Sequence, residues 1–418
     1  MKYVILVGDG MGDLPMTELG GKTPLEAAET PVMDYLAGRG VLRRLRTVPE
    51  GFAPGSDVAN LSLLGYRPAE CYSGRAPLEA ASMGVELPDD AIAFRCNLVT
   101  LEQSDQGRVK MVDYSAGHID TASAAGLIRM LDAELGNEFC RFYPGVSYRH
   151  LLVWRRACAG LVTAPPHDHS GQDVAELWRR YQAVPGLGEV VQRAAQLLAA
   201  APENERRRRE GINPANAIWL WGEGKPPAME TLRQQFGVSG ALISAVDLLK
   251  GIGVYAGMEI INVAGATGYL DTNYQGKVAA ALAALDRHDL AFVHIEAPDE
   301  VSHQGDLGKK LQAIADFDQQ VVGPVLEGLQ RRGEDFRLVV TMDHFTPISI
   351  RTHTDLPVPF LLYDSRHHCR NPADCQGSCW QDPPAGAYSE RRAENSPLLP
   401  DGRAFLRFVL DREGGEAE

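Results

Sequence analysis

The chain has 418 residues, of which 44% are hydrophobic and 23% are charged, and these proportions are ordinary for a globular protein. Its 55 Asp and Glu residues exceed its 41 Lys and Arg residues, and the net charge of −14 argues against a nucleic-acid-binding protein. No apolar run approaches the roughly 18 residues of a membrane-spanning helix, and the N-terminus lacks the cleavage site of a signal peptide. We therefore expect a cytoplasmic protein with room for two domains of about 150 residues each.

The first predicted element is a buried strand over residues 3–7, an unbroken run of Tyr, Val, Ile and Leu. It ends in a glycine-rich turn at residues 8–10. A dinucleotide-binding fingerprint would need a third glycine at Asp13, and a P-loop over the later GGKT segment would need one at Met16. Asp9 is therefore either a turn residue or a metal ligand, because open α/β sheets bind ligands at the carboxyl ends of their strands.

Two later segments repeat the pattern of an apolar run that ends at acidic residues or histidine. FRLVVTMDHF ends at Asp343 and His344, and HDLAFVHIEAPDE ends near Asp299. Strand-like runs alternate with helical stretches, which predicts an α/β fold with a mainly parallel sheet. His303 follows Asp299 by four residues, a spacing that places both side chains on one face of a helix. His353 follows His344 by nine residues.

These acidic and imidazole side chains predict two metal sites. Aspartate and histidine ligands suit zinc or manganese, whereas an all-oxygen set would suit magnesium or calcium. The simplest partition places Asp299, His303 and His353 on one metal, and Asp9, Asp343 and His344 on the other. Two-metal centres serve phosphoryl transfer and related reactions. His294, inside the apolar run AFVHIE, is interpreted as a core or strand residue with satisfied hydrogen bonds.

A candidate nucleophile lies in the segment PGSDVANLSLLG, where Ser56 stands at the predicted start of a helix. One interpretation is an N-cap serine, which is the more common role for this residue type. The other is a nucleophile that a neighbouring metal deprotonates, at a helix N-terminus that stabilises anions. The sequence leaves both interpretations open.

The middle of the chain differs in character from its two ends. Residues from about 92 to 155 are rich in β-type runs, and residues 187–211 are predicted as one long helix whose basic run at 206–209 is solvated. WLWGEGKPPAM, at residues 219–229, is interpreted as a linker. The predicted organisation is a core domain formed by residues 1–76 and 225–418, with an inserted second domain at residues 77–224.

Seven segments together resemble the cofactor-independent phosphoglycerate mutases, which do not require 2,3-bisphosphoglycerate, in the archaeal-type branch of the alkaline phosphatase superfamily. They lie between residue 4 and about residue 364 and are VGDGMGD, GSDVANLSLLGY, YSGRAPLEAAS, GALISAVDLLKGIG, GATGYLDTNYQGK, EAPDEVSHQGD and DHFTPISIRTHT. The resemblance implies an alkaline-phosphatase-like α/β core with a smaller inserted α/β domain. It further implies two divalent metal ions, with manganese or zinc favoured over magnesium or cobalt.

The resemblance also implies the reaction and the roles of individual residues. Phosphoryl transfer between 3- and 2-phosphoglycerate, a step of glycolysis and gluconeogenesis, would pass through a phosphorylated Ser56 that completes the shell of the second metal. Lys250 would be the counter-charge for the phosphoryl group, and the alternative is a helix-surface lysine. In the inserted domain the implied residues are three for substrate binding, His118, Arg149 and Arg75, and Asp168 as a proton shuttle. Arg75 could equally be a hinge residue, and domain closure would exclude water.

Two cysteine groups and one departure from the family pattern stand apart. Cys71, Cys96, Cys140 and Cys158 are scattered and are interpreted as reduced, structural thiols. The later cluster could bind a structural zinc or form a loop without one, and it comprises His367, His368, Cys369, Cys375 and Cys379. Phe345 stands where the family often has proline after the Asp-His pair.

Three rival functions remain open. A homoserine kinase would need ATP, and the sequence has no P-loop, although a core of this superfamily could use ATP without one. A plain metal-dependent phosphatase has no need of a large insert that holds and re-aims a product. A non-catalytic metal- or phosphosugar-binding sensor would not need a complete ligand set with a nucleophile. We expect a small-molecule substrate, no nucleic-acid or membrane partner, and a monomer or weak homo-oligomer.

Overall fold

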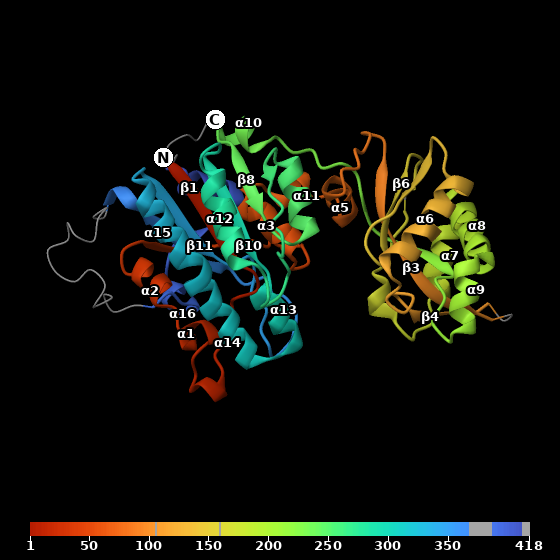
Figure 1. Ribbon diagram of the computed structural model, residues 1–418, viewed down its shortest axis with the longest axis horizontal. Helices are drawn as coiled ribbons and strands as arrows, with labels where there is room; N and C mark the ends of the chain where they lie inside the picture. The colour runs from red at the N-terminus through yellow and green to blue at the C-terminus, as the bar shows by residue number, and fades with distance from the viewer. Residues whose placement is uncertain (105–106, 159, 368–386, 412–418) are drawn as a thin grey trace. The chain divides into compact units, whose positions relative to one another are not determined.

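The computed structural model describes residues 1–104, 107–158, 160–367 and 387–411. The chain divides into two compact units (Figure 1). Unit 1 comprises Met1–Tyr72 and Ala228–Glu418, and unit 2 comprises Ser73–Pro227. Unit 2 is therefore inserted between the two segments of unit 1. In the part of the chain that the structure describes, every helix is too short or too polar to cross a membrane.

Unit 1 is built on an eight-stranded sheet, whose strands among the described residues are β1 (Lys2–Gly8), β2 (Val41–Leu45), β8 (Gly240–Ile243), β9 (Glu259–Ile260), β10 (Leu290–Ile295), β11 (Phe336–Thr341), β12 (Val358–Asp364) and β13 (Leu398–Leu399). The strand order is β13-β2-β12-β11-β1-β10-β8-β9. The central block β11-β1-β10-β8 is parallel, whereas β12 runs antiparallel to both β11 and β2. These parallel strands are almost wholly buried, which explains their continuous apolar sequences. The predicted α/β class with a mainly parallel sheet is confirmed.

Helices of unit 1 pack against the side chains of this sheet. α12 packs against β8 and β10, and α2 packs against β12 (Figure 1). The described helices of unit 1 are α1 (Pro24–Ala27), α2 (Pro31–Ala37), α3 (Ser56–Leu63), α4 (Pro68–Cys71), α10 (Leu232–Phe236), α11 (Asp247–Tyr255), α12 (Tyr274–Ala284), α13 (Ala297–Gln304), α14 (Leu307–Asp316), α15 (Gly323–Arg332), α16 (Glu390–Ala393) and α17 (Gly402–Val409). A π-helical turn, Phe317–Val322, joins α14 to α15.

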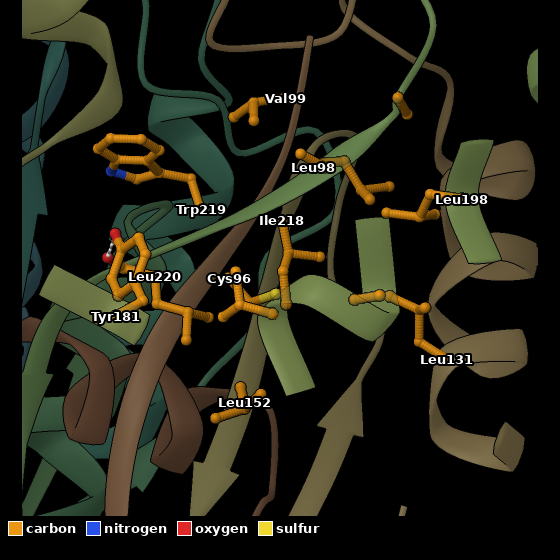
Figure 2. Close-up of a cluster of buried hydrophobic side chains, with 14 of the residues drawn as sticks. Cys96, Leu98, Val99, Leu131, Leu152, Tyr181, Leu198, Ile218, Trp219 and Leu220 are labelled. Atoms are coloured by element: carbon orange, nitrogen blue, oxygen red, sulfur yellow. Dashed lines mark hydrogen bonds between the residues drawn. The ribbon is translucent and has the colours of Figure 1, made fainter. Parts of the chain in front are cut away.

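Unit 2 contains a separate antiparallel sheet, whose strands are β3 (Ile92–Gln103), β4 (Val109–Asp113), β5 (Cys140–Tyr143), β6 (Arg149–Trp154) and β7 (Ala217–Gly224). β3 pairs with β4, β6 and β7. The described helices of this unit are α5 (Arg75–Ser82), α6 (Thr121–Leu135), α7 (Ala175–Gln182), α8 (Leu187–Ala200) and α9 (Pro202–Arg209). Figure 2 shows side chains of β3 and β7 packed with Leu131 of α6 and Leu198 of α8. Unit 2 thus has a hydrophobic core of its own.

Two segments of unit 2 differ from the sequence prediction. Residues 219–224, predicted as the start of a linker, belong to strand β7, which is buried beside β3. Gly222, Glu223 and Gly224, followed by Lys225 and two prolines, hid the strand character of this segment because they break the apolar run. The single helix predicted over residues 187–211 is two helices, since Pro202 begins α9 and has no backbone N–H to continue the hydrogen bonding of α8.

The basic run at residues 206–209 is only partly solvated. Arg207 is buried, with 4% of its surface exposed. Its guanidinium donates hydrogen bonds to the carbonyl oxygens of Ala116 and Asn213. The charge pattern predicted a solvent-exposed face, and this prediction was wrong for Arg207 because two loop carbonyls lie within its reach.

The two ends of unit 2 lie next to each other within that unit. Ser73 Oγ donates a hydrogen bond to the carbonyl oxygen of Lys225 at 2.5 Å. A Cβ added to Gly74 would lie 2.1 Å from the carbonyl oxygen of Glu223, and Gly74 has a φ of 147°. Only glycine permits this approach and this backbone conformation without strain. The start of α5 and the end of β7 are therefore fastened together.

A buried lysine of α14 fastens two loops of unit 1. Lys310 is fully buried, and its Nζ donates to the carbonyl oxygens of Gly12 at 3.1 Å and Thr346 at 3.0 Å. It also pairs with Asp13 Oδ2 at 2.8 Å, and the same oxygen accepts from the backbone N–H of Ile348 at 3.1 Å. The Lys310 ammonium group thus binds both the loop after β1 and the loop after β11, which also contact each other through their backbones.

We expect the Lys310→Met variant to lose about 3–5 kcal/mol of unfolding free energy, because the change leaves Asp13 buried without its partner. The measurement is chemical denaturation followed by far-UV circular dichroism. Lys309→Met is the matched control: this neighbour is 46% exposed in its side chain and pairs with Asp306 at the surface, so its loss should stay below about 1 kcal/mol. Equal losses of unfolding free energy in both variants would contradict the role of Lys310 in holding the two loops.

A buried histidine of unit 2 makes that unit sensitive to acid. His150 on β6 is 2% exposed, and its Nδ1 accepts from the backbone N–H of Gly145 at 3.0 Å. Its Nε2 has no hydrogen-bond partner among the described residues. Burial lowers the pKa of His150 to about 3. Unit 2 therefore folds with a neutral imidazole at this position.

The unfolding free energy of unit 2 should decrease as the pH falls. His150 alone should contribute up to about 1.4 kcal/mol per pH unit to this decrease. Below about pH 6.5 the unfolded chain binds a proton on His150 that the folded chain does not bind, so this contribution is present above pH 6.5 and is lost as the pH falls toward 3. Tryptophan fluorescence during denaturation at several pH values measures it. His150→Gln should reduce this pH dependence of the unfolding free energy, and the control His169→Gln should keep it. A wild-type pH profile in His150→Gln would contradict the assignment of this acid sensitivity to His150.

Candidate metal centre

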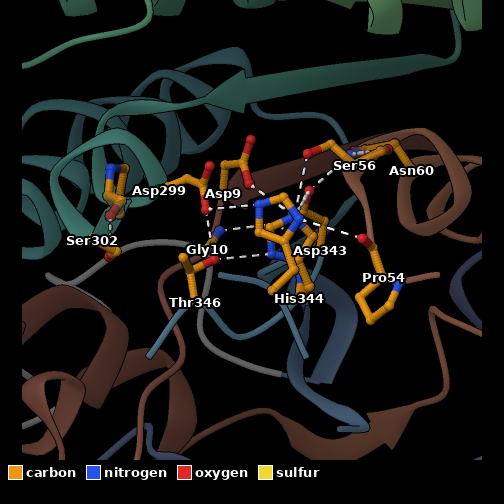
Figure 3. Close-up of polar contacts among 12 residues, drawn as sticks. Asp9, Gly10, Pro54, Ser56, Asn60, Asp299, Ser302, Asp343, His344 and Thr346 are labelled. Carbon is orange, nitrogen blue, oxygen red and sulfur yellow. Dashed lines mark hydrogen bonds and ion pairs between the residues drawn. The ribbon is translucent and has the colours of Figure 1, made fainter. Parts of the chain in front are cut away.

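The carboxyl ends of three adjacent parallel strands carry the candidate ligands. Asp9 follows β1, Asp343 follows β11 by two residues, and Asp299 lies on α13, just after β10. β1 lies between β10 and β11 in the sheet. The three carboxylates consequently converge at one edge, where Figure 3 shows them around His344. The sequence predicted this convergence from the position of each acid at a strand end.

The first group forms around Asp299. Its Oδ2 lies 3.0 Å from His303 Nε2, and its Oδ1 lies 3.6 Å from His353 Nε2. The two imidazole Nε2 atoms are 3.0 Å apart. Asp299 and His303 lie four residues apart on α13, so the predicted one-face geometry is confirmed. The hydrogen bond to Asp299 raises the pKa of His303 to about 9.

The second group forms around His344, which is fully buried. Its Nε2 lies 3.5 Å from Asp9 Oδ1, 3.4 Å from Asp343 Oδ2 and 3.2 Å from Ser56 Oγ. Burial raises the pKa of Asp9 well above its usual value, and the nearby negative charge of Asp343 raises it further. Carboxylates buried this close together need cations to remain ionised.

Ser56 is the first residue of α3, and Gly55 occupies the N-cap position. The N-cap interpretation of Ser56 is therefore wrong, since its hydroxyl faces His344 rather than the helix N–H groups. Asn60 steadies this arrangement: its Nδ2 donates to the carbonyl oxygen of Ser56 at 2.8 Å and to Asp343 Oδ2 at 3.0 Å. Figure 3 shows Ser56 and Asn60 on the same side of His344.

All three histidines of the cluster present the same ring nitrogen to it. His303 Nδ1 donates to the carbonyl oxygen of Arg351 at 2.9 Å, and His353 Nδ1 faces that of Pro54 at 3.4 Å. His344 Nδ1 donates to Thr346 Oγ1 at 3.1 Å, because the Thr346 hydroxyl gives its own proton to Asp299. Outer partners of this kind fix the tautomer and leave Nε2 free to bind a metal.

Orphaned buried polar atoms support the same conclusion. Among the described residues, Asp9 Oδ1, His294 Nε2 and Asn60 Oδ1 lack hydrogen-bond partners. The ligand atoms of Asp299, His344 and His353 lie within 4.8 Å of one another, as do those of Asp9, His294 and Asp343. The structure thus contains two candidate metal-binding groups, and their nitrogen and oxygen donors suit divalent transition metals.

His294 is the residue that the sequence analysis misjudged in this region. It lies on β10 and is fully buried, as predicted. Its Nε2 is nevertheless without a hydrogen-bond partner among the described residues and lies 3.0 Å from Asp9 Oδ2. The sequence carried no signal for this contact, because it depends on strand register: His294 pairs with Val7, two residues before Asp9. An imidazole this close to a strand end faces the ligands of the neighbouring strand.

Lys250 lies on α11, with its Nζ 3.2 Å from Asp247 Oδ1. Its side chain is 19% exposed, and it lies near enough to Lys277 to help lower that residue's pKa, after the larger effect of burial. It is therefore more enclosed than a typical surface lysine. Its role as a phosphoryl counter-charge stays a prediction.

Within unit 2 the predicted substrate-binding residues lie around Arg95. Burial lowers the pKa of Arg95 to about 10, and the positive charges of Arg75 and Arg149 lower it further. The Arg95 guanidinium lies over the Trp221 ring, 4.0 Å from its centroid, and pairs with Glu79 at 3.1 Å. The sequence analysis missed Arg95 because a charged residue in a buried strand has no distinctive spacing.

The remaining predicted residues of unit 2 lie on exposed loops near an aromatic cluster. His118 packs edge-on against Tyr114 and Tyr148. Asp168 lies on a 3₁₀ turn, Pro166–His169, with its Oδ1 3.6 Å from His167 Nε2. His167 itself packs against Tyr114 and the ring of Trp221. His118 and His167 thus share Tyr114 as a neighbour.

Two minor predictions concern cysteines and the departure from the family pattern. Cys71, Cys96, Cys140 and Cys158 are free thiols, as predicted. The candidate zinc cluster lies outside the described residues apart from His367, which is exposed. Phe345 forms isolated backbone bridges with Met11 and Thr354.

Comparison with known proteins identifies the family. The family model for 2,3-bisphosphoglycerate-independent phosphoglycerate mutase matches residues 37–204. A probable mutase of this kind from Geobacter sulfurreducens is 50% identical over 413 residues, which cover 99% of this chain and 100% of that protein. The mutase of Methanosarcina barkeri is 54% identical over 364 residues, 87% of this chain and 90% of the relative.

A solved structure shares the whole fold. It is a protein from Pyrococcus horikoshii with a TM-score of 0.78 and 27% sequence identity, and the match covers 100% of this chain and 99% of the other. The fold, the ligand-rich strand edge and the sequence relatives agree with the resemblance seen in the sequence. The chain belongs to the family of 2,3-bisphosphoglycerate-independent phosphoglycerate mutases.

Proposed function

We propose that this chain interconverts 3-phosphoglycerate and 2-phosphoglycerate through a phosphoserine at Ser56. The observation that carries the proposal is the position of Ser56 Oγ, 3.2 Å from His344 Nε2 at the edge of the carboxylate cluster. A serine hydroxyl there is placed to receive a phosphoryl group at the amino end of α3, where the helix dipole favours an anion. The 2- or 3-hydroxyl of the glycerate would then take the group back.

Two divalent metal ions, manganese or zinc, would be held by the cluster. One would bind Asp299, His303 and His353, and the other would bind Asp9, Ser56, Asp343 and His344. Bound there, such ions lower the pKa of a hydroxyl ligand and neutralise the charge on phosphoryl oxygens. Lys250 would add a positive charge on the phosphoryl group.

The glycerate would be held by unit 2. The positive charges of Arg75 and Arg149 lie close enough to Arg95 to lower its pKa, and guanidinium groups bind carboxylates and phosphates in pairs of hydrogen bonds. His118 is exposed beside this cluster, and Asp168 would carry the proton between the two hydroxyl groups. Among the described residues these are the groups of unit 2 best suited to an anionic three-carbon acid.

Assays of activity and binding distinguish the kinase, phosphatase and sensor alternatives from the mutase. Turnover of homoserine with ATP, without conversion of phosphoglycerate, would support a kinase. Release of inorganic phosphate without interconversion would support a phosphatase. Binding without any turnover would support a sensor. The cytoplasmic location, and the state of a monomer or weak homo-oligomer, stay predictions.

Wild-type protein loaded with Mn²⁺ should interconvert the two phosphoglycerates without 2,3-bisphosphoglycerate. Ser56→Ala should reduce kcat by more than about a thousandfold, since removal of a nucleophile leaves only residual catalysis. The assay couples 2-phosphoglycerate formation to a chromogenic reaction, and mass spectrometry of quenched wild-type enzyme should find phosphate on Ser56. Removal of metal with a chelator should abolish activity, and Mn²⁺ should restore it.

The matched control is Ser396→Ala, a serine outside the cluster, which should keep wild-type activity. Full activity in Ser56→Ala would contradict the phosphoserine route. Failure of metal-loaded wild type to interconvert the phosphoglycerates would contradict the proposed reaction as a whole.

Arg149→Met should raise KM for 3-phosphoglycerate by about 10–100-fold, since a hydrogen bond to a charged group contributes about 1.5–3 kcal/mol. Its Mn²⁺ affinity should stay at the wild-type level, because Arg149 lies in unit 2 and the metal ligands lie in unit 1. Steady-state kinetics and a Mn²⁺ titration measure the two quantities. Arg129→Met, at an exposed position of α6, is the control. An unchanged KM in Arg149→Met would rule out this role.

A further inference from the structure

The segment of unit 2 that carries His118 has an unusual backbone. Ala116, Gly117 and His118 have φ angles of 50°, 68° and 47°, which makes three left-handed residues in succession. A Cβ atom disfavours this conformation, and residues other than glycine normally adopt it singly. Ala116 is fully buried, whereas His118 is exposed. This left-handed turn, residues 116–118, therefore needs neighbouring groups that hold it in place.

The carboxylate of Asp113, at the end of β4, holds the N–H groups of the left-handed turn. Its Oδ1 accepts hydrogen bonds from the backbone N–H and the hydroxyl of Ser115, at 2.8 and 2.7 Å. Its Oδ2 accepts from the backbone N–H of Gly117 at 2.7 Å and from Asn213 Nδ2 at 2.8 Å. The Ser115 hydroxyl oxygen accepts from the backbone N–H of His118 at 3.1 Å. One carboxylate and one hydroxyl thus bind two of the three N–H groups of the turn.

Arg207 holds a carbonyl group of the same turn. It lies on α9 with 4% of its surface exposed, and its Nη2 donates to the carbonyl oxygen of Ala116. Its Nε donates at 3.0 Å to the carbonyl oxygen of Asn213, whose side chain binds Asp113. A Cβ added to Gly117 would lie 3.3 Å from Arg207 Nη2, so the guanidinium lies directly against the turn. One buried arginine of the basic run therefore ties α9 to the left-handed turn.

The chain that follows the turn is anchored independently of Arg207. The carbonyl oxygen of Ile119 accepts from Ser147 Oγ at 2.7 Å, and Thr121 Oγ1 accepts from the backbone N–H of Ser147 at 3.1 Å. Asp120 then caps the first turn of α6. Loss of the Arg207 contacts should therefore loosen residues 116–118 and leave α6 and the loop around Ser147 in place.

The backbone of the turn sets the direction of the exposed imidazole. His118 packs edge-on against Tyr114 and Tyr148, with ring centroids 6.3 and 6.0 Å away. The two tyrosines also pack edge-on against each other at 5.7 Å. Because the Cα–Cβ bond turns with the backbone, a change of φ at His118 would carry the imidazole away from both rings. The turn therefore determines where the imidazole is presented.

We propose that Arg207 is a positioning residue for substrate binding: it holds residues 116–118 in the left-handed conformation that directs His118 toward the phosphoglycerate. The inference rests on the proposed function and extends it, since Arg207 is buried and lies outside the residues expected to contact the substrate. If the turn kept this conformation in only about a tenth of the molecules, the apparent Kd would rise about tenfold. Saturating substrate would restore the competent population, so kcat should change little.

The first measurement is the Cε1–H resonance of His118 in the Zn²⁺-loaded full-length protein with ¹³C-labelled histidine, assigned by its loss in His118→Gln. Arg207→Met should move this resonance toward that of an unstructured histidine, because the ring leaves the two tyrosines. Arg207→Lys can still donate to the Ala116 carbonyl oxygen, so it should move the resonance less. Arg208→Met is the matched control: this exposed neighbour also donates to a carbonyl oxygen, that of Ala199 at 2.8 Å, and should leave the resonance unchanged.

Steady-state kinetics of the Mn²⁺-loaded variants distinguish positioning from a general loss of structure. Arg207→Met should raise KM for 3-phosphoglycerate about tenfold, with kcat within about twofold of wild type. In the His118→Gln background the same substitution should raise KM by less than about twofold, because it acts through a side chain that is no longer there. Ser115→Ala removes the hydroxyl that binds His118 and Asp113, so it should raise KM about 2–10-fold. This variant and Arg207→Lys keep the test available if Arg207→Met does not fold.

Three outcomes would overturn the proposal. An unchanged His118 resonance in both Arg207→Met and Ser115→Ala would show that the turn does not depend on these contacts. A shifted resonance with a wild-type KM would leave the turn no role in substrate binding. Equal rises of KM from Arg207→Met with and without His118 would assign the loss to another part of unit 2.

Failure of the proposed function would be recognised separately. A wild type that converts no phosphoglycerate would refute the proposed reaction and, with it, the part of the turn in substrate binding. The His118 resonance is measured without turnover, so it would still show whether Arg207 fixes the position of His118.

Discussion

The structure of unit 1 depends on the burial of three carboxylates at one edge of the sheet. Asp9, Asp299 and Asp343 are each less than a tenth exposed, and buried like charges repel one another strongly. The surrounding elements supply what opposes this repulsion: N–H groups that bind Asp343, imidazoles that pair with Asp299, and the His294 imidazole beside Asp9. The neighbouring loops also help to compensate the buried charges, since each carries a candidate ligand or a hydrogen-bond partner of one.

Much of this site could be predicted from the sequence because its chemistry is repeated at strand ends. An apolar run followed by an acid predicted both the parallel sheet and the position of Asp9 and Asp343 at its edge. The four-residue spacing of Asp299 and His303 predicted a shared helix face. In each case a local pattern was enough, because the geometry of a strand end or a helix turn is itself local.

The sequence could not reveal the parts that depend on long-range contacts. His294 resembled a core residue because its partner, Asp9, is distant in the sequence and adjacent only through strand register. Arg207 resembled a solvated charge and Arg95 carried no signal of its own, since their partners come from other elements of unit 2. β7 resembled a linker because the glycines and Glu223 at its end conceal a buried strand. Tertiary context decides all of these positions.

The contact between Ser73 and Lys225 has a consequence for how a discontinuous unit can assemble. Once unit 2 has folded, its two ends are held together. The folded insert then adds little to the length of the connection between the two segments of unit 1. The entropic cost of closing a loop grows with the logarithm of its length, and fastening the ends of the insert about halves the connection from β1 to β10, which lowers this cost by about 0.6 kcal/mol. Early folding of the insert would therefore lower the entropic barrier to pairing β1 with β10 and β11, the strands that lie on opposite sides of it in the sequence.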